Sequence, residues 1–103
     1  MRIAFLRTGG FAGLRLGLEL DTNSMEARAA SELTELVQKA DFYKLPARLS
    51  ATDQVRDRFQ YRLRVSSSAK EEHEVVADEG SVPPELRPLL TRLTDLALQR
   101  APE

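Results

Sequence analysis

With 103 residues and 42% hydrophobic content, the chain can form one domain with a single core. A net charge of −1 with 30% charged residues argues against strong electrostatic binding to nucleic acid or to an anionic membrane. The lack of cysteine excludes disulfides and thiolate metal sites. We find no signal-peptide pattern and no membrane-length apolar run, so we expect a cytoplasmic protein, although non-classical export would leave no such mark.

The first feature along the chain is a glycine-rich turn between two strand-like segments. Apolar residues alternate over roughly 2–7 and again over 14–20, which predicts two β-strands. Between them lies the stretch Thr8-Gly9-Gly10-Phe11-Ala12-Gly13. Because glycine readily adopts the positive φ angles of tight hairpin turns, this pattern predicts a β-hairpin.

Side-chain parity indicates where the aromatic residue of this turn points. If both strands place their apolar residues on the core, antiparallel partners must have residue numbers with an odd sum. A tight turn then pairs Phe5 with Leu14, whereas a wider loop pairs Phe5 with Leu16. In both registers we expect Phe11 to be exposed at the tip of the hairpin.

A helix is predicted next, over roughly 23–40. Asn23 and Glu26 have the spacing of a capping box, which would satisfy free amides at a helix start. Apolar residues then recur at helical spacing and form one stripe. The stripe consists of Ala29, Leu33, Leu36, Val37 and Ala40.

The segment 41–57 shows no periodicity. Phe42 and Leu45 are expected to return to the core, Tyr43 to be half exposed, and Pro46 to prevent ladder pairing. Such a long connection in a small domain is often functional. A partly ordered crossover is the plainer interpretation.

Two more strands and a second helix follow. Alternation predicts strands over roughly 58–66 and 70–78, and leucines at helical spacing predict a helix that opens at Pro83. Pro88 fits this helix only if its regular hydrogen bonding begins late, or with a local kink.

The charges on the second pair of strands favour one register. A three-residue turn places Arg64 opposite Glu72 and Arg62 opposite Glu74, so two ion pairs cross the hairpin. The element order is therefore ββαββα. We predict one two-layer α+β domain over residues 1–103, with antiparallel hairpins packed against two helices. The order of the strands across the sheet does not follow from the sequence.

A search for catalytic chemistry finds no candidate. His73 is the only histidine, and neighbouring glutamates at 72 and 74 would project from the opposite face of a strand. The stretch 9–13 lacks the ending of a phosphate loop and leads into a strand. We therefore expect no catalytic residues, no cofactor and no metal site, and favour a binding module over an enzyme.

The opening residues, Met1 to Gly13, resemble the N-terminal signature of emfourin-type proteins, which are small bacterial inhibitors of thermolysin-like zinc metallopeptidases such as protealysin. Weaker similarity continues over nearly the whole chain. The resemblance implies a proteinaceous inhibitor that blocks the active-site cleft of a thermolysin-like, or protealysin-like, metallopeptidase. We expect a monomer that binds neither nucleic acid nor membrane.

The residues proposed to contact the peptidase come from the glycine-rich turn and the long loop. They are Gly9, Gly10, Phe11, Ala12, Gly13 and Tyr43. Phe11 would enter or brace an apolar subsite of the cleft, unless this stretch merely makes a turn for backbone reasons. Two other functions stay open from the sequence: a non-inhibitory interaction or regulatory domain, and a binder of a small molecule between sheet and helices.

Overall fold

A computed structural model describes residues 1–9, 14–49, 59–67 and 71–100 of the chain. The predicted exposure of Phe11 lies outside these residues, as do the rest of the hairpin tip and residues 50–57 of the long loop. No helix in the described part of the chain is long and apolar enough to span a membrane.

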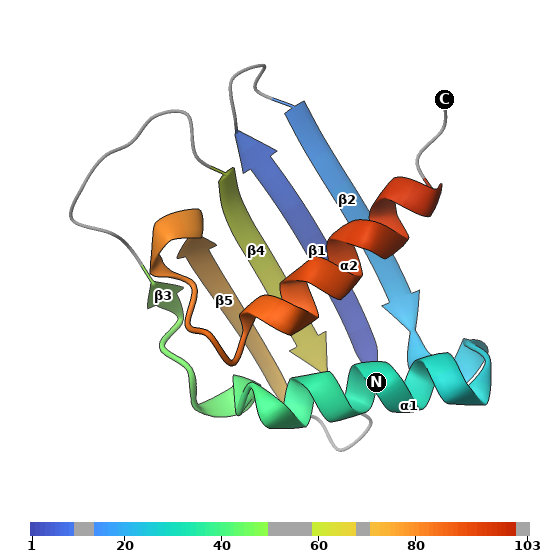
Figure 1. Cartoon of the computed structure of the whole chain (residues 1–103). Coiled ribbons are helices and arrows are strands. Elements are labelled where there is room, and N and C mark those ends of the chain that lie inside the picture. The colour runs from blue at the N-terminus through green and yellow to red at the C-terminus, as the bar shows by residue number, and fades with distance from the viewer. Residues whose placement is uncertain (10–13, 50–58, 68–70, 101–103) are drawn as a thin grey trace.

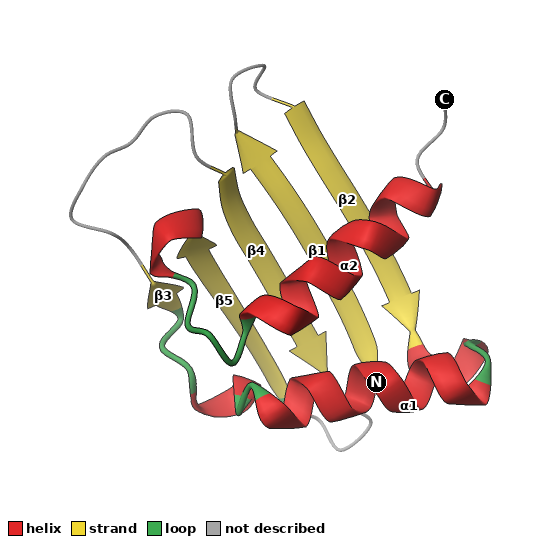
Figure 2. Ribbon diagram, viewed as in Figure 1, coloured by secondary structure: helices red, strands yellow, loops and turns green. Residues whose placement is uncertain are grey.

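The described elements are five strands and two α-helices (Figures 1 and 2). In chain order they are β1 (Arg2–Gly9), β2 (Leu14–Asp21), α1 (Ala27–Lys39), β3 (Arg48–Leu49), β4 (Phe59–Ser66), β5 (Glu72–Asp78) and α2 (Arg87–Arg100). Short 3₁₀ helices lie at Thr22–Ser24, Phe42–Lys44 and Glu79–Ser81. The predicted α+β class and the ββαββα order are confirmed, and β3 is an added strand that the sequence did not predict.

The strands form one sheet in the order β2-β1-β4-β5-β3. All neighbours are antiparallel except β3, which pairs parallel to β5. Pro46 lies just before β3, so the ladder starts only after the residue that cannot donate a hydrogen bond. The inner strand β1 is paired on both sides over its full length, from Arg2 to Gly9.

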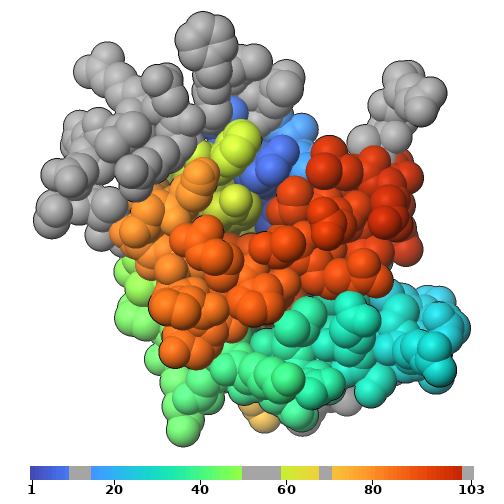
Figure 3. Space-filling view, viewed as in Figure 1, coloured from blue at the N-terminus to red at the C-terminus, as the bar shows by residue number. Residues whose placement is uncertain are grey.

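Both helices cover the same face of the sheet. α2 crosses the strands obliquely, and α1 lies beside it along one end of the sheet (Figures 1 and 3). Alternate residues of every long strand meet the apolar stripes of the helices in the core between the two layers. The buried core comprises Ile3, Phe5, Leu18, Leu20, Leu33, Val37, Ala40, Phe42, Leu63, Val65, Val75, Ala77, Val82, Leu86, Leu89, Leu90, Leu93 and Ala97.

We call the other side of the sheet the open face, because no described helix covers it. On β4 and β5, the charged side chains of this face form ion pairs with one another. Arg62 Nε lies 3.2 Å from Glu74, and Arg64 lies 3.4 Å from Glu72 and 3.1 Å from Glu74. Glu74 raises the pKa of the Arg64 guanidinium through a hydrogen bond and its charge. The four side chains form a small, largely exposed ionic network across β4 and β5.

Both predicted registers of the first hairpin are wrong, although the odd-sum rule holds. Phe5 faces Leu18, and Ile3 faces Leu20. The strands continue two residues closer to the turn than predicted, to Gly9, and one residue beyond the predicted end, to Asp21. The observed ladder pairs more backbone hydrogen-bonding groups than the register with a two-residue turn would. Four residues then remain between the two strands.

The register of the second hairpin is also shifted, by two residues. Arg64 lies directly opposite Glu74, not Glu72. The two predicted ion pairs nevertheless form, because a long arginine side chain reaches the diagonal neighbour as well as the residue opposite. Charge pairing therefore identified the right partners but could not distinguish registers two residues apart.

The predicted capping box at the start of α1 is absent. Asp21 accepts a hydrogen bond from the Asn23 amide at 3.0 Å and caps a 3₁₀ turn there. The α-helix begins only at Ala27, and Glu26 makes no side-chain cap. At α2, by contrast, the prediction of a late start is confirmed, since the regular helix begins at Arg87, one residue before Pro88.

Candidate functional site

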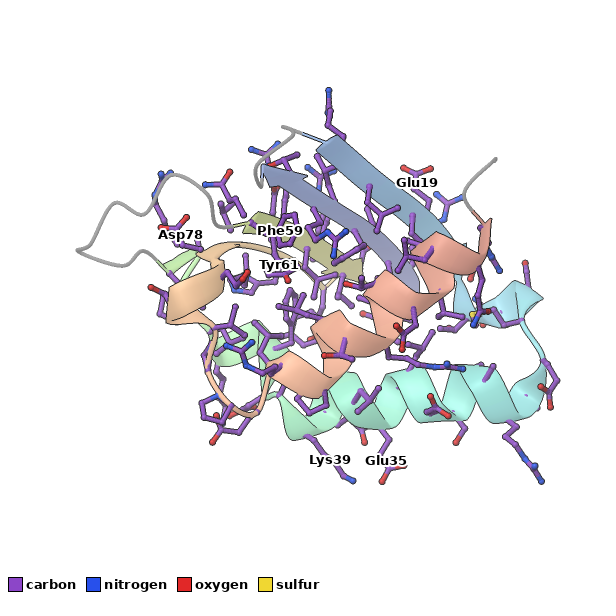
Figure 4. The ribbon with its side chains drawn as sticks, turned by 45° about the horizontal axis from the view of Figure 1, so that its top comes forward. Glu19, Glu35, Lys39, Phe59, Tyr61 and Asp78 are labelled. Carbon is purple, nitrogen blue, oxygen red and sulfur yellow. The ribbon has the colours of Figure 1, made fainter. Side chains whose placement is uncertain are left out.

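The ends of several strands meet at one end of the sheet, which we call the hairpin end. Gly9 of β1 pairs with Leu14 of β2 on one side and with Phe59 of β4 on the other. Asp78, the last residue of β5, pairs with Gln60 beside them. The labelled residues Phe59, Tyr61 and Asp78 lie toward this end in Figure 4.

Gly9 has a backbone conformation that favours glycine. Its φ angle is 98°, in the region that side chains with a Cβ rarely adopt. The residue that leaves the sheet toward the hairpin tip is therefore glycine for a backbone reason. This agrees with a backbone role for Gly9.

An aromatic ring and a cation are stacked at the hairpin end. The Arg7 guanidinium carbon lies 4.1 Å from the centre of the Phe59 ring, within the range of a cation–π interaction. Both residues are only partly buried, although their parity places them on the helix side of the sheet. Gly9, opposite Phe59, has no side chain to cover the ring.

Tyr61 lies between this pair and the core. Its ring lies 6.2 Å from that of Phe5, which is in the core. Burial and the Glu79 carboxylate raise the pKa of the Tyr61 phenol, while the charges of Arg7 and Arg87 oppose the rise. The rigid core thus continues through Tyr61 to the exposed end of the sheet.

A shallow groove of about 140 Å³ lies between this part of the sheet and α2. Arg7 and Tyr61 line one side, and Leu90, Thr91 and Thr94 line the other. The groove is small compared with ordinary small-molecule sites, which hold about 300–1,000 Å³. This groove therefore gives little support to a small ligand bound between the sheet and α2.

Tyr43 lies at the opposite end of the sheet from Gly9. Its hydroxyl is near Ser67, which follows the last residue of β4, and Ser66 of β4 pairs with Arg2 at the start of β1. The seven steps along β1 from residue 2 to residue 9 correspond to roughly 23 Å. The structure therefore does not bring Tyr43 and Gly9 together.

The surroundings of Tyr43 are those of a packing residue. Its ring contacts that of Phe42, with centroids 6.0 Å apart, and it packs against the core. The hydroxyls of Tyr43 and Ser67 are buried, and neither has a hydrogen-bond partner of good geometry among the described residues. Burial raises the pKa of the Tyr43 phenol, Glu71 adds to the increase, and Ser67 opposes it.

His73 lies at the same end of the sheet as Tyr43. Its Nε2 donates to the Leu45 carbonyl oxygen at 2.6 Å, and its ring contacts Phe42 edge-on. Glu72 and Glu74 project from the other face of β5, as predicted. Within the described ranges, no three acidic or histidine side chains come together in an arrangement that could hold a metal.

The sequence did not single out Arg7 and Phe59. Arg7 was only the last residue of the strand predicted over roughly 2–7, and Phe59 lay within the strand predicted over roughly 58–66. The available signal was parity: an arginine at a core-facing position needs a reason to be there, and a nearby aromatic ring supplies one.

The fold and the hairpin end define a small, open-faced α+β domain with one preorganised exposed end, which is a design suited to binding another protein. A family model matches residues 5–94, and its family is Emfourin. The chain therefore belongs to the Emfourin family, as the resemblance of its opening residues suggested. Neither the curated proteins nor the solved structures contain a significant match to the chain.

Proposed function

We propose that this protein inhibits a thermolysin-like zinc metallopeptidase and blocks its active-site cleft with the hairpin end of the sheet. The observation that carries the proposal is the Emfourin match over nearly the whole chain, since that family is known for metallopeptidase inhibition. No catalytic role is assigned to any residue, and the protein would act by occupying the cleft.

The hairpin end is suited to this task because its parts are held before any partner arrives. β1 is paired on both sides up to Gly9, and Phe59 is stacked under Arg7. A surface that is already ordered loses little conformational entropy on docking. Partly buried aromatic and arginine side chains are also the residues most often found as energetic anchors of interfaces.

In the proposed complex, the glycine-rich stretch Gly9 to Gly13 approaches the cleft wall, and Phe11 fills an apolar subsite. Phe59 and Arg7 would contact the rim of the cleft. Tyr43 lies some seven residue steps away along the sheet, so its position favours a packing role over a contact in the same cleft. The cytoplasm is our proposed compartment, and fractionation of the producing cells tests it.

The test is a titration of the purified protein into a thermolysin-like peptidase with a small peptide substrate. Inhibition that reaches completion near one inhibitor per enzyme supports the proposal. Phe11→Ala should then weaken inhibition. Full peptidase activity at a large excess of folded protein would contradict the proposal and favour a non-inhibitory interaction domain.

A further inference from the structure

The two edge strands of the sheet differ in length. On one side β5 is covered by β3, which is only two residues long. On the other side β2 is an eight-residue edge strand, and no described residue pairs with its outer edge. A long free edge presents unpaired amides and carbonyls, and it is a ready template for a strand from another chain.

The charges of β2 on the open face lack partners within the described structure. Arg15 lies opposite Thr8 and Glu19 lies opposite Ala4, and neither β1 residue can form an ion pair. The open-face arginines of β4 and glutamates of β5, in contrast, are paired with one another. Glu19 projects from β2 away from the helices in Figure 4. A strand added beside β2 would bring new partners within reach of Arg15 and Glu19.

The order of the charges along β2 indicates which strand could pair with its free edge. They are of opposite sign and lie two residues on either side of Gly17. We propose that β2 pairs antiparallel with β2 of a second copy of this chain, about a two-fold axis beside Gly17. Each Arg15 then lies opposite the Glu19 of the other copy, so one contact is formed twice, as in any two-fold interface.

Other two-fold registers use these charges less well. An axis beside Leu18 would place Arg15 opposite Asp21, whose carboxylate already accepts the Asn23 amide. It would also leave Glu19 opposite Gly17. The register centred on Gly17 therefore pairs the two free charges and leaves the cap at Asp21 intact.

The helix side of the sheet favours the same arrangement. α2 crosses over β2, and its last turn extends past the outer edge of that strand (Figures 1 and 4). That turn carries Leu98, which is 55% exposed and is the one large apolar side chain that is exposed among the described residues. In the dimer, Leu16 lies opposite the Leu18 of the other copy, and the added strand and helix provide apolar cover beside Leu98.

The dimer is independent of the proposed inhibition. Because the two β2 strands run antiparallel, the two hairpin ends point in opposite directions, and each remains accessible to its own partner. The sequence led us to expect a monomer. The strand order, which leaves β2 at the edge and which the sequence does not specify, is what changes that expectation.

The test is sedimentation velocity of the purified protein over a wide range of concentration, with variants at the interface. We expect a monomer–dimer equilibrium in the wild type. Arg15→Glu replaces two attractive contacts by two repulsive ones, and it should raise the dimer dissociation constant by at least tenfold. The double variant Arg15→Glu with Glu19→Arg exchanges the signs and should restore dimerisation.

Arg28→Glu on α1 is the matched control, because Arg28 is exposed, has no ion pair among the described residues and belongs to a helix, not to the edge strand. It should leave the dissociation constant unchanged. Circular dichroism and thermal unfolding verify that each variant is folded. A wild type that is monomeric at every concentration overturns the proposal. It is equally overturned by a dimer that Arg15→Glu does not weaken, or that the double variant does not restore.

Discussion

Replacing Phe59 by alanine tests whether the hairpin end contacts the peptidase. A partly buried phenylalanine leaves on the order of 50 Å² for a partner to cover, which contributes roughly 1.3 kcal/mol at about 25 cal/mol per Å². The Arg7 guanidinium, 4.1 Å from the ring centre, would also lose its support, which costs about 0.5–1 kcal/mol. Together these losses of about 2 kcal/mol correspond to a roughly 30-fold weaker inhibition constant.

The assay is steady-state inhibition of a thermolysin-like peptidase, with Tyr43→Ala as the aromatic control at the other end of the sheet. Urea unfolding of both variants separates a loss of folded protein from a loss of contact. We expect Phe59→Ala to weaken inhibition and folded Tyr43→Ala to inhibit like the wild type. The opposite pattern, with a normal constant for Phe59→Ala and a weakened one for Tyr43→Ala, would refute the assignment of the hairpin end.

Three further predictions concern stability. Gly9→Ala forces a side chain into a φ of 98°, so it should lower the free energy of unfolding by about 1–2 kcal/mol; an unchanged urea midpoint would show that the angle is readily relaxed. Tyr43→Phe removes a buried hydroxyl without a good partner, so stability should stay equal or rise by up to about 1 kcal/mol, whereas a clear loss would reveal a hydrogen bond. Folding raises the pKa of Tyr43 and Tyr61 above 10.0, so the protein should keep its full free energy of unfolding below that pH and lose part of it as the pH rises further. The loss should follow the phenolate absorbance, and phenolate formation at the pH of free tyrosine would contradict the prediction.

Much of the fold followed from local pattern. The alternation in the strands and the apolar stripes of the helices predicted the class, the element order and the core faces, because both signals are periodic in the sequence itself. Registers were harder, since parity distinguishes neighbouring registers but not those two residues apart. Phe5 therefore lies on the predicted face of the sheet, but its partner is Leu18 and not the predicted Leu14 or Leu16.

Features that depend on distant segments could not be predicted. β3 is two residues long and exists only because β5 offers an edge. The start of α1 was misplaced because Asp21, which caps a 3₁₀ turn through Asn23, competes with the expected capping box. The separation of Tyr43 from Gly9 depends on the path of the whole chain, which local patterns do not contain.

The candidate site was predicted in part. Gly9, which was predicted to lie in the turn, is the last residue of β1, and it has the positive φ that favours glycine. Arg7 and Phe59 come from strands far apart in sequence, and only the pairing of β1 with β4 makes them neighbours. A single arginine at a core-facing position was the available sign, and its partner could not be identified before the strand order was known.

Amide hydrogen exchange of the protein, alone and bound to a thermolysin-like peptidase, tests directly whether the hairpin end is the inhibitory surface. Binding through the hairpin end predicts slower exchange around Gly9 and at Phe59 and Gln60, with little change around Tyr43 and Leu45. The purified protein in an equal amount should also abolish peptidase activity. Protection confined to the Tyr43 end would contradict binding through the hairpin end, and the lack of a stable complex with a cognate peptidase would contradict inhibition itself.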